Sequence, residues 1–334
     1  MKSTLSIGTA TAGPGQKVWG EIPIPDAYGA QLEPPRVVVV NGTGDGPTIY
    51  IGAGAHGDEY NAIEAVRRAA LDLDPGALRG QVIFVPTQNS AAFRARTRHS
   101  PADDKDIDYC YPGRSGGSAT EALADLLFQQ AVTKADYLLD LHTATRAGWN
   151  LTHALVAPEP AATAPQARAL AAAFGCKVIV MLESAPGAHL GQKMGWNLDH
   201  NLFVQAAKRG IPATIIEFGE GGRLEPDQVE IGYRGIRQVL GSLQMLDLLD
   251  DRRSGPSQPF IARESIAVRP ATQGLLDLHI QPGEPVTRGQ VIARVISFPD
   301  EVEEVRSGVN GVMIRVATEG VVTPNDRVAV IGAS

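Results

Sequence analysis

Short apolar runs alternate with amphipathic stretches along the chain from residue 37 onward. Runs rich in Val, Ile and Leu predict strands at 37–40, 48–52, 81–86, 137–141, 177–181 and 213–218. Ala- and Leu-rich stretches with Glu and Arg on the opposite face predict helices at 61–73, 119–133, 161–174 and 228–249. This alternation is typical of a largely parallel sheet covered by helices, so we expect an α/β fold.

The pattern changes at DDRRSGPSQP, residues 250–259, after which short Val/Ile strands are separated by Gly and Pro. The sequence therefore predicts an α/β domain over 1–250 and a small β domain over 259–334. Two quasi-repeats in the second domain, at 274–295 and 307–332, are similar to a lipoyl-like hammerhead. The comparable turn at 306–310 offers Arg306 and no lysine, so we expect a structural or oligomerising role rather than covalent cofactor carriage.

Composition and charge narrow the class of protein. The 334 residues are 43% hydrophobic and 20% charged, which is ordinary for a globular protein. The net charge is −7 and the basic residues are scattered, so neither nucleic acid nor an anionic membrane is an expected partner. The N-terminus lacks an apolar signal segment, and the two cysteines, Cys110 and Cys176, form no Cys-x-x-Cys pair. We expect a cytoplasmic protein.

The first segment with candidate chemistry is IYIGAGAHGDE at 49–59, where an apolar strand enters a Gly-rich turn. His56 and Glu59 lie three residues apart at the start of the next helix, and an imidazole and a carboxylate so placed can bind a divalent cation such as zinc. The alternative is a solvated histidine and a glutamate favoured by the helix dipole.

The second segment, LLDLH at 138–142, is an apolar strand that ends in Asp140 and His142. Strand alternation places both side chains on one face at the carboxyl end, where open α/β sheets have their sites. His142 could complete a two-histidine, one-carboxylate set that leaves a fourth metal position for water. Asp140 is either a partner of that histidine or a buried capping carboxylate.

The third segment, ATIIEFGEGG at 213–222, is another apolar strand, and it carries Glu217 before a Gly-rich loop. A carboxylate in a partly desolvated site beside a metal can accept a proton from water and pass it to a leaving amine. A helix-capping or salt-bridged glutamate is the alternative interpretation.

Residues 86–113, PTQNSAAFRARTRHSPADDKDIDYCYPG, add a longer pattern. It is similar to "N-P-x-A-F", an Arg, a Ser-Pro-like turn and "D-L-N-R-x-F-P-G" of the succinylglutamate desuccinylase/aspartoacylase family. The corresponding places are held by Asn89, Ala92, Phe93, Arg98, Asp106, Pro112 and Gly113. The chain resembles this family over about residues 45–225. The resemblance implies a three-layer α/β/α zinc carboxypeptidase-like domain with a smaller C-terminal β domain.

The resemblance also implies a site. His56, Glu59 and His142 would bind one Zn²⁺ per chain, Glu217 would be the catalytic carboxylate, and Arg98 would polarise the scissile carbonyl. The implied reaction is hydrolysis of a small N-acyl amine substrate by zinc-bound water, in a chain that could form a homo-oligomer. A zinc carboxypeptidase acting on peptides and a noncatalytic metal-binding protein are the alternatives.

One position departs from the family pattern, because Asp108-Tyr109 replaces the "N-R" that helps hold the substrate carboxylate. We expect Asn89, Asp108 and Tyr109 to contact substrate, and we hypothesise that Asp108 favours a neutral or cationic group, as in an N-acylated diamino acid. Asp108 could equally be a turn residue. Other carboxylate anchors are available in principle, and the sequence does not choose among Arg146, Arg209 and Arg223.

Overall fold

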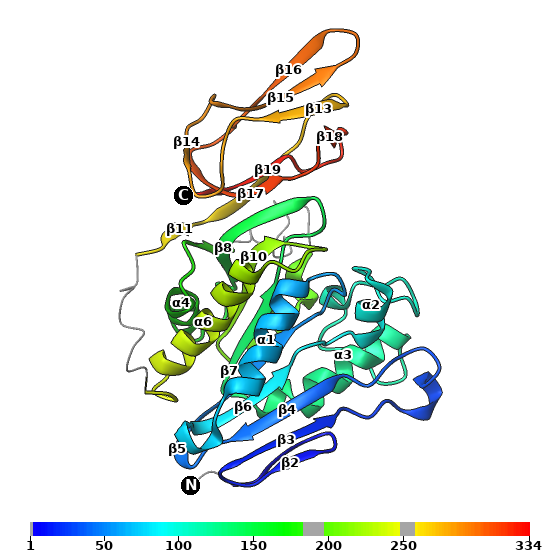
Figure 1. Ribbon diagram of the computed structural model, residues 1–334, viewed down its shortest axis with the longest axis vertical. Helices are drawn as coiled ribbons and strands as arrows, with labels where there is room; N and C mark the ends of the chain where they lie inside the picture. The colour runs from blue at the N-terminus through cyan, green and yellow to red at the C-terminus, as the bar shows by residue number, and fades with distance from the viewer. Residues whose placement is uncertain (1–2, 183–196, 248–257) are drawn as a thin grey trace.

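The computed structural model describes residues 3–182, 197–247 and 258–334 (Figure 1). Most of the predicted linker at 250–259 lies outside these ranges. The strands before the linker are β1 (Leu5–Ile7), β2 (Ala10–Ala12), β3 (Gln16–Glu21), β4 (Arg36–Asn41), β5 (Gly44–Ala53), β6 (Arg79–Val85), β7 (Tyr137–His142), β8 (Gly148–Val156), β9 (Val178–Met181) and β10 (Ala213–Glu220). The helices are α1 (Tyr60–Asp72), α2 (Ser90–Ala95), α3 (Ala119–Gln130), α4 (Ala164–Phe174), α5 (Leu202–Lys208) and α6 (Pro226–Ser242).

The strands after the linker are β11 (Phe260–Ala262), β12 (Glu264–Val268), β13 (Gly274–Leu278), β14 (Pro285–Val286), β15 (Val291–Ser297), β16 (Glu301–Arg306), β17 (Gly311–Ala317), β18 (Val321–Val322) and β19 (Ala329–Ala333). One large mixed sheet runs in the order β12-β19-β17-β8-β10-β7-β5-β6-β4-β3, with β9, β11 and β14 attached beside this path. A separate four-stranded sheet has the order β16-β15-β13-β18.

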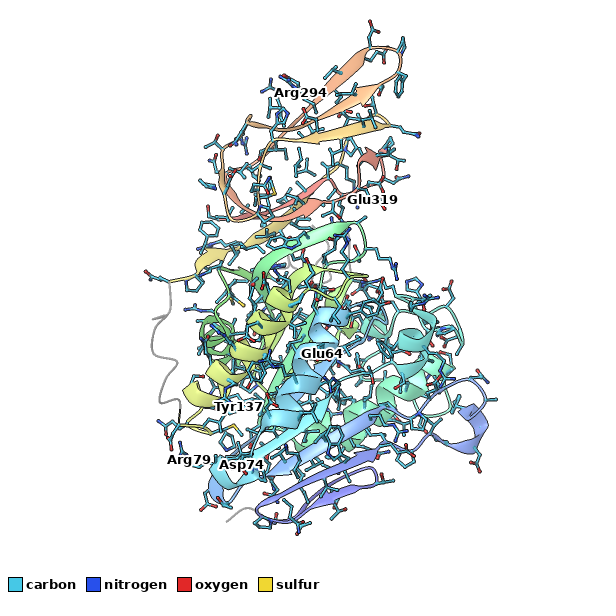
Figure 2. All side chains as sticks on the ribbon, viewed as in Figure 1. Glu64, Asp74, Arg79, Tyr137, Arg294 and Glu319 are labelled. Carbon is cyan, nitrogen blue, oxygen red and sulfur yellow. The ribbon has the colours of Figure 1, made fainter. Side chains whose placement is uncertain are left out.

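The central strands β6, β5, β7 and β10 are parallel, β4 and β8 join them antiparallel, and β3 pairs antiparallel with β4. Figure 2 labels Arg79 and Tyr137, the first residues of β6 and β7, at the lower end of the sheet. The carboxyl ends of these strands therefore point toward the C-terminal strands in the upper part of the view. Ligand sites of open α/β sheets lie at this edge.

Helices cover both faces of the sheet, as a three-layer fold requires. One buried cluster joins α1, α4 and α6 to the sheet through residues such as Val66, Leu170 and Ile236, and these helices lie in front of the sheet in Figure 1. A second cluster joins α3 and α5 to the opposite face through Leu127 and Phe203. The predicted three-layer α/β fold is confirmed, and each of the six predicted strands and four predicted helices is present.

The C-terminal strands have a buried cluster of their own and also contribute to the large sheet. β12, β17 and β19 extend the large sheet, and β17 pairs antiparallel with β8. The quasi-repeats correspond to β13-β14-β15 and β17-β18-β19, which exchange their short strands: β14 pairs with β17, and β18 pairs with β13. Because β17 continues the sheet next to β8, this part of the chain lies beside the carboxyl edge of the central strands.

Three elements near that edge were not predicted from the sequence, namely α2, β8 and α5. Within residues 3–182, 197–247 and 258–334, no helix is both long and apolar enough to cross a bilayer.

Candidate active site

His56 and Glu59 lie in the turn between β5 and α1, as predicted. Gly54 in this turn has a φ of +66°, and a Cβ at Gly57 would lie 1.9 Å from the carbonyl oxygen of Ala92, so the turn packs directly against α2. Glu59 occupies the N-cap position of α1 without capping it. Its carboxylate Oε1 instead lies 2.7 Å from Nδ1 of His56, and both side chains are buried.

His142, the last residue of β7, brings a second imidazole to the same carboxylate. Its Nδ1 lies 3.1 Å from Oε2 of Glu59, which also accepts a hydrogen bond of 3.2 Å from the backbone N–H of Thr143. The rings of His56 and His142 have centroids 5.1 Å apart. Two Nδ1 atoms and one carboxylate, taken from two strand ends, thus converge on one point.

The opposite nitrogen of each imidazole faces a different carboxylate. Nε2 of His56 lies 3.2 Å from Oδ1 of Asp106 and 3.3 Å from Oδ2 of Asp108, and Nε2 of His142 lies 3.2 Å from Oδ2 of Asp140. Metal-binding histidines have this arrangement, in which one ring nitrogen binds the metal while the other donates its N–H to a carboxylate. The orientation of both rings therefore suits a metal bound at Nδ1.

A buried chain of polar side chains lies behind His142. Tyr111 donates a hydrogen bond of 2.8 Å to Oε1 of Gln88, and Gln88 donates one of 2.6 Å to Oδ1 of Asp140. All three side chains are fully buried. The chain fixes the orientation of Asp140 and keeps its carboxylate beside the ring of His142, which supports the interpretation of Asp140 as a histidine partner.

The buried charges around this point depend strongly on one another. Burial would raise the pKa of Glu59, but the two imidazoles beside it lower the pKa to about 2. Asp108 behaves in the same way, with a pKa of about 2. Burial opposes protonation of His56 and His142, yet the surrounding carboxylates raise both of their pKa values well above the usual range. The site therefore retains positive charge on its imidazoles.

The residues fit a bound cation. His56, Asp108 and His142 each offer a ligand atom, and these atoms lie within 4.8 Å of one another. Oδ1 of Asp108 is buried without a hydrogen-bond partner among the described residues. Four buried carboxylates, those of Glu59, Asp106, Asp108 and Asp140, surround two imidazoles, and when these rings are neutral a divalent ion would offset part of the negative charge. Nitrogen and oxygen donors together suit several divalent transition metals.

Glu217 lies on β10, in register with His142 on β7 and with His153 on β8. Its Oε2 accepts a hydrogen bond of 2.8 Å from Nδ2 of Asn150. Burial and the charge of Glu59 raise the pKa of Glu217 to about 7, against the opposing influence of His142. A carboxylate with a pKa in this range can both accept and donate a proton near neutral pH.

Arg98 approaches the site from the segment after α2. Its Nε donates a hydrogen bond of 2.9 Å to Oδ2 of Asp106, and its Nη1 lies 3.4 Å from Nδ1 of His56. The guanidinium is thus held beside the imidazole of His56, with 33% of the side chain exposed.

His56, Arg98, Asp108 and Glu217 line a small cavity of about 60 Å³ that opens to solvent. The walls come from both parts of the chain. The N-terminal part contributes His56, Arg98, Asp108, Tyr109, Thr143, Asn150, His153 and Glu217, and the C-terminal strands contribute Ser265, Ile314, Arg315, Arg327 and Val330.

The residues expected to contact substrate occupy different places. Asp108 is buried in the cavity wall, and Tyr109 lies there with 40% of its surface exposed. Asn89 is fully buried and caps α2, since its Oδ1 accepts a hydrogen bond of 3.1 Å from the N–H of Ala92. Asn89 is not among the residues that line the cavity.

The sequence interpretation did not assign Asn150, His153, Arg315 or Arg327 to the site. A signal for the first two was available, since LTHALV at 151–156 is an apolar run that ends before Pro158 and reads as a strand. No local signal marks the two arginines, because long-range strand pairing brings them to the cavity: β17 pairs with β8 at Arg315, and Arg327 lies just before β19, which pairs with β17.

Comparison with known proteins identifies the class. Residues 45–243 match the succinylglutamate desuccinylase/aspartoacylase catalytic domain, and the chain belongs to this family. The resemblance drawn from the sequence motifs is thereby confirmed.

A relative within this class is the N-alpha-acetyl-L-2,4-diaminobutyric acid deacetylase of Halomonas elongata. It is 34% identical to this chain over 307 residues, which cover 88% of this chain and 81% of the relative. Together with the family match, this similarity supports an amide-bond deacylase activity.

Two solved structures share the fold. The product-bound ectoine utilization protein EutE (DoeB) from Ruegeria pomeroyi has a TM-score of 0.79 and 25% identity, over 96% of this chain and 95% of that chain. A succinylglutamate desuccinylase/aspartoacylase from Rhodobacter sphaeroides has a TM-score of 0.79 and 24% identity, over 100% of this chain and 96% of that chain.

Proposed function

We propose that this protein is a zinc-dependent deacylase that hydrolyses the amide bond of a small N-acylated amino acid, with N-acetyl diamino acids as its substrates. The observation that carries the proposal is the convergence of two imidazole Nδ1 atoms on the carboxylate of Glu59, in a cavity that also holds Glu217. The relative from Halomonas elongata, whose name specifies an N-acetylated diaminobutyric acid, supports the substrate class. A cytoplasmic location and a homo-oligomeric state remain predictions.

His56, Glu59 and His142 are the proposed metal ligands. Nδ1 of His56 lies 2.7 Å from Oε1 of Glu59, and Nδ1 of His142 lies 3.1 Å from Oε2, so the three side chains are near enough to one another to share one zinc ion. A bound zinc ion would supply Lewis-acid polarisation of the amide carbonyl and would acidify water. Asp106 and Asp108 are further carboxylates within reach of His56 through the opposite ring nitrogen.

Glu217 is the proposed proton carrier. With its pKa near 7, the carboxylate is sufficiently basic to take a proton from the attacking water, and the resulting acid can donate it to the departing amine nitrogen. Asn150 holds one carboxylate oxygen, so the other stays directed to the reacting atoms.

Arg98 is the proposed electrophile beside the carbonyl. Its guanidinium lines the cavity and is fixed by Asp106, so it can stabilise negative charge as it develops on the carbonyl oxygen. Asp108 places a negative charge in the cavity wall at the position where the family usually has a neutral amide, and this charge favours an amino group on the substrate over a second carboxylate.

The first experiment is a substrate panel. Purified protein loaded with zinc is given Nα-acetyl-2,4-diaminobutyrate, N-acetylaspartate, N-succinylglutamate and short peptides, and release of free amine is measured. We expect the acetylated diamino acid to have the highest kcat/KM. A clear preference for a dicarboxylate would overturn the proposed substrate class, and activity on peptides alone would identify a carboxypeptidase.

The second experiment separates catalysis from metal binding. Glu217→Gln should keep one zinc per chain while kcat falls by about 10²–10⁴-fold, the usual contribution of a general acid-base. If the variant retained both zinc and the full rate, Glu217 would not be the proton carrier. If wild-type protein with zinc bound released no amine from any substrate, the noncatalytic alternative would be correct.

A further inference from the structure

Two arginines from the C-terminal strands form one wall of the active-site cavity. Arg315 lies on β17, opposite Asn150 of β8, and only 8% of its surface is exposed. Its Nη1 donates a hydrogen bond of 3.0 Å to the backbone carbonyl of Arg327, and its Nη2 donates one of 3.2 Å to Oγ1 of Thr145. The guanidinium also packs on Gly148, where a Cβ would lie 2.1 Å from Nη2. Arg315 is therefore held in one orientation.

Positive charge is concentrated on this wall. Burial and the neighbouring guanidinium of Arg327 lower the pKa of Arg315 to about 10, with a smaller contribution from Arg269 and an opposing one from Glu217. Burial lowers the pKa of Arg327 as well, and Arg98 and Arg269 act in the same direction. An anion bound between these guanidinium groups would offset the cost of their desolvation and would reduce the repulsion between them.

The two carboxylates on the cavity wall have other partners. Asp108 lies against Nε2 of His56, and Glu217 accepts its hydrogen bond from Asn150, although the charge of Glu217 still reaches Arg315 and Arg327. The described wall thus has a negative side, formed by Asp108 and Glu217 near the two imidazoles, and a positive side on β17 and the segment before β19.

The three arginines that the sequence offered as carboxylate anchors do not line this cavity. Arg146 donates a hydrogen bond of 3.0 Å to Asp58. Arg223 lies 3.8 Å from the carboxylate of Glu220. Arg209 lies over the ring of Phe128, 5.7 Å from its centroid. A substrate carboxylate inside the cavity would meet none of them.

We propose that Arg315 and Arg327 bind the carboxylate of the N-acyl amino acid, so that the C-terminal strands supply the carboxylate subsite of the enzyme. The inference rests on the proposed deacylase function and extends it. A planar guanidinium pairs with a carboxylate through two parallel hydrogen bonds, which a fixed arginine can form without further ordering. The substrate would then lie with its carboxylate toward β17 and its amino group toward Asp108.

The test compares Nα-acetyl-2,4-diaminobutyrate with its neutral carboxamide, Nα-acetyl-2,4-diaminobutyramide. For the wild-type zinc enzyme we expect kcat/KM to be higher for the acid by about 10²-fold or more, as charge-assisted hydrogen bonds imply. Arg315→Gln and Arg327→Gln should each lower kcat/KM for the acid by about 10–100-fold, mainly through KM, and leave the carboxamide within about threefold. Arg315→Lys should recover part of the loss.

A matched control is Arg269→Gln. Arg269 belongs to the same group of positive charges but does not line the cavity, and its removal should change the ratio of acid to carboxamide by about threefold or less. Zinc content and melting temperature of each variant are measured alongside. If Arg315→Gln did not fold, Arg327→Gln and Arg315→Lys would still decide the question.

The outcomes separate the two proposals. If wild-type enzyme hydrolysed acid and carboxamide equally well, or if the arginine variants lost both activities together, the carboxylate subsite would be wrong while the deacylase function stood. If wild-type enzyme with zinc bound hydrolysed neither compound nor any other acyl amine, the deacylase function itself would be wrong, and the subsite with it.

Discussion

Asn150 donates a hydrogen bond of 2.8 Å from its Nδ2 to Oε2 of Glu217, across the antiparallel pair β8 and β10. This bond favours the ionised carboxylate in a site where burial raises its pKa to about 7. Asn150 therefore controls both the direction and the protonation of the proposed proton carrier.

Asn150→Leu should raise the pKa of Glu217 further, because the donor to the charged form is lost. Since the base must be ionised, the acid limb of the pH profile of kcat/KM should move upward by about 0.5–1 unit, and kcat should fall by about 10-fold or more. Rates are measured from pH 5.5 to 9 with zinc present. When Glu217→Gln is already present, Asn150→Leu should lower kcat little further. An equally large further fall in kcat would contradict the proposed coupling between Asn150 and Glu217.

Glu59→Gln and Asp108→Asn distinguish the two carboxylates that lie near the imidazoles. Glu59 lies between the two Nδ1 atoms, so its substitution should weaken zinc binding by more than about 100-fold. This loss exceeds the one expected for a residue that contacts only a ligand and not the metal. Asp108→Asn should retain zinc within about 10–100-fold and should mainly change substrate preference. Competition with a chromophoric chelator measures both affinities. The reverse order would mean that the bound cation uses His56, Asp108 and His142 instead.

Removal of the metal should make stability depend on pH. In metal-free protein, burial opposes the charge on His56 and His142, but the carboxylates raise their folded-state pKa values above the unfolded value. Stability from these imidazoles is complete below about pH 6.5, the unfolded pKa, and is lost as pH rises through the higher folded values. The melting temperature of chelated protein should therefore fall with rising pH, and the gain on adding zinc should grow. A gain independent of pH would contradict this linkage.

Arg98→Lys should lower kcat by about 10²-fold while KM changes less, because a flexible ammonium does not reproduce the guanidinium held by Asp106 beside the imidazoles. Arg94→Lys, four positions earlier in the last turn of α2, is the matched control. The Arg94 side chain is 77% exposed and pairs with Glu33 at 2.7 Å, so this variant should keep the wild-type rate. Equal losses in the two variants would place the effect in folding rather than in catalysis.

The sequence by itself determined the elements and the motifs of this protein. Apolar runs that end in His142 and Glu217, and the Gly-rich turn that contains His56 and Glu59, are local patterns, because strand and turn preferences depend on neighbouring residues. The parallel order of the central strands then brings their carboxyl ends to one edge, as the alternation of strands and helices predicts.

Only the tertiary structure decided which strands flank that edge. Asn150 and His153 meet Glu217 because β8 turns back antiparallel beside β10, and Arg315 reaches the cavity because β17, over 150 positions further along the chain, continues the sheet at β8. Strand order and register arise from long-range pairing and from the burial of whole faces, and no local stretch of sequence encodes them. The positive wall of the cavity, formed by Arg315 and Arg327, is therefore decided by the tertiary structure and not by any local sequence pattern.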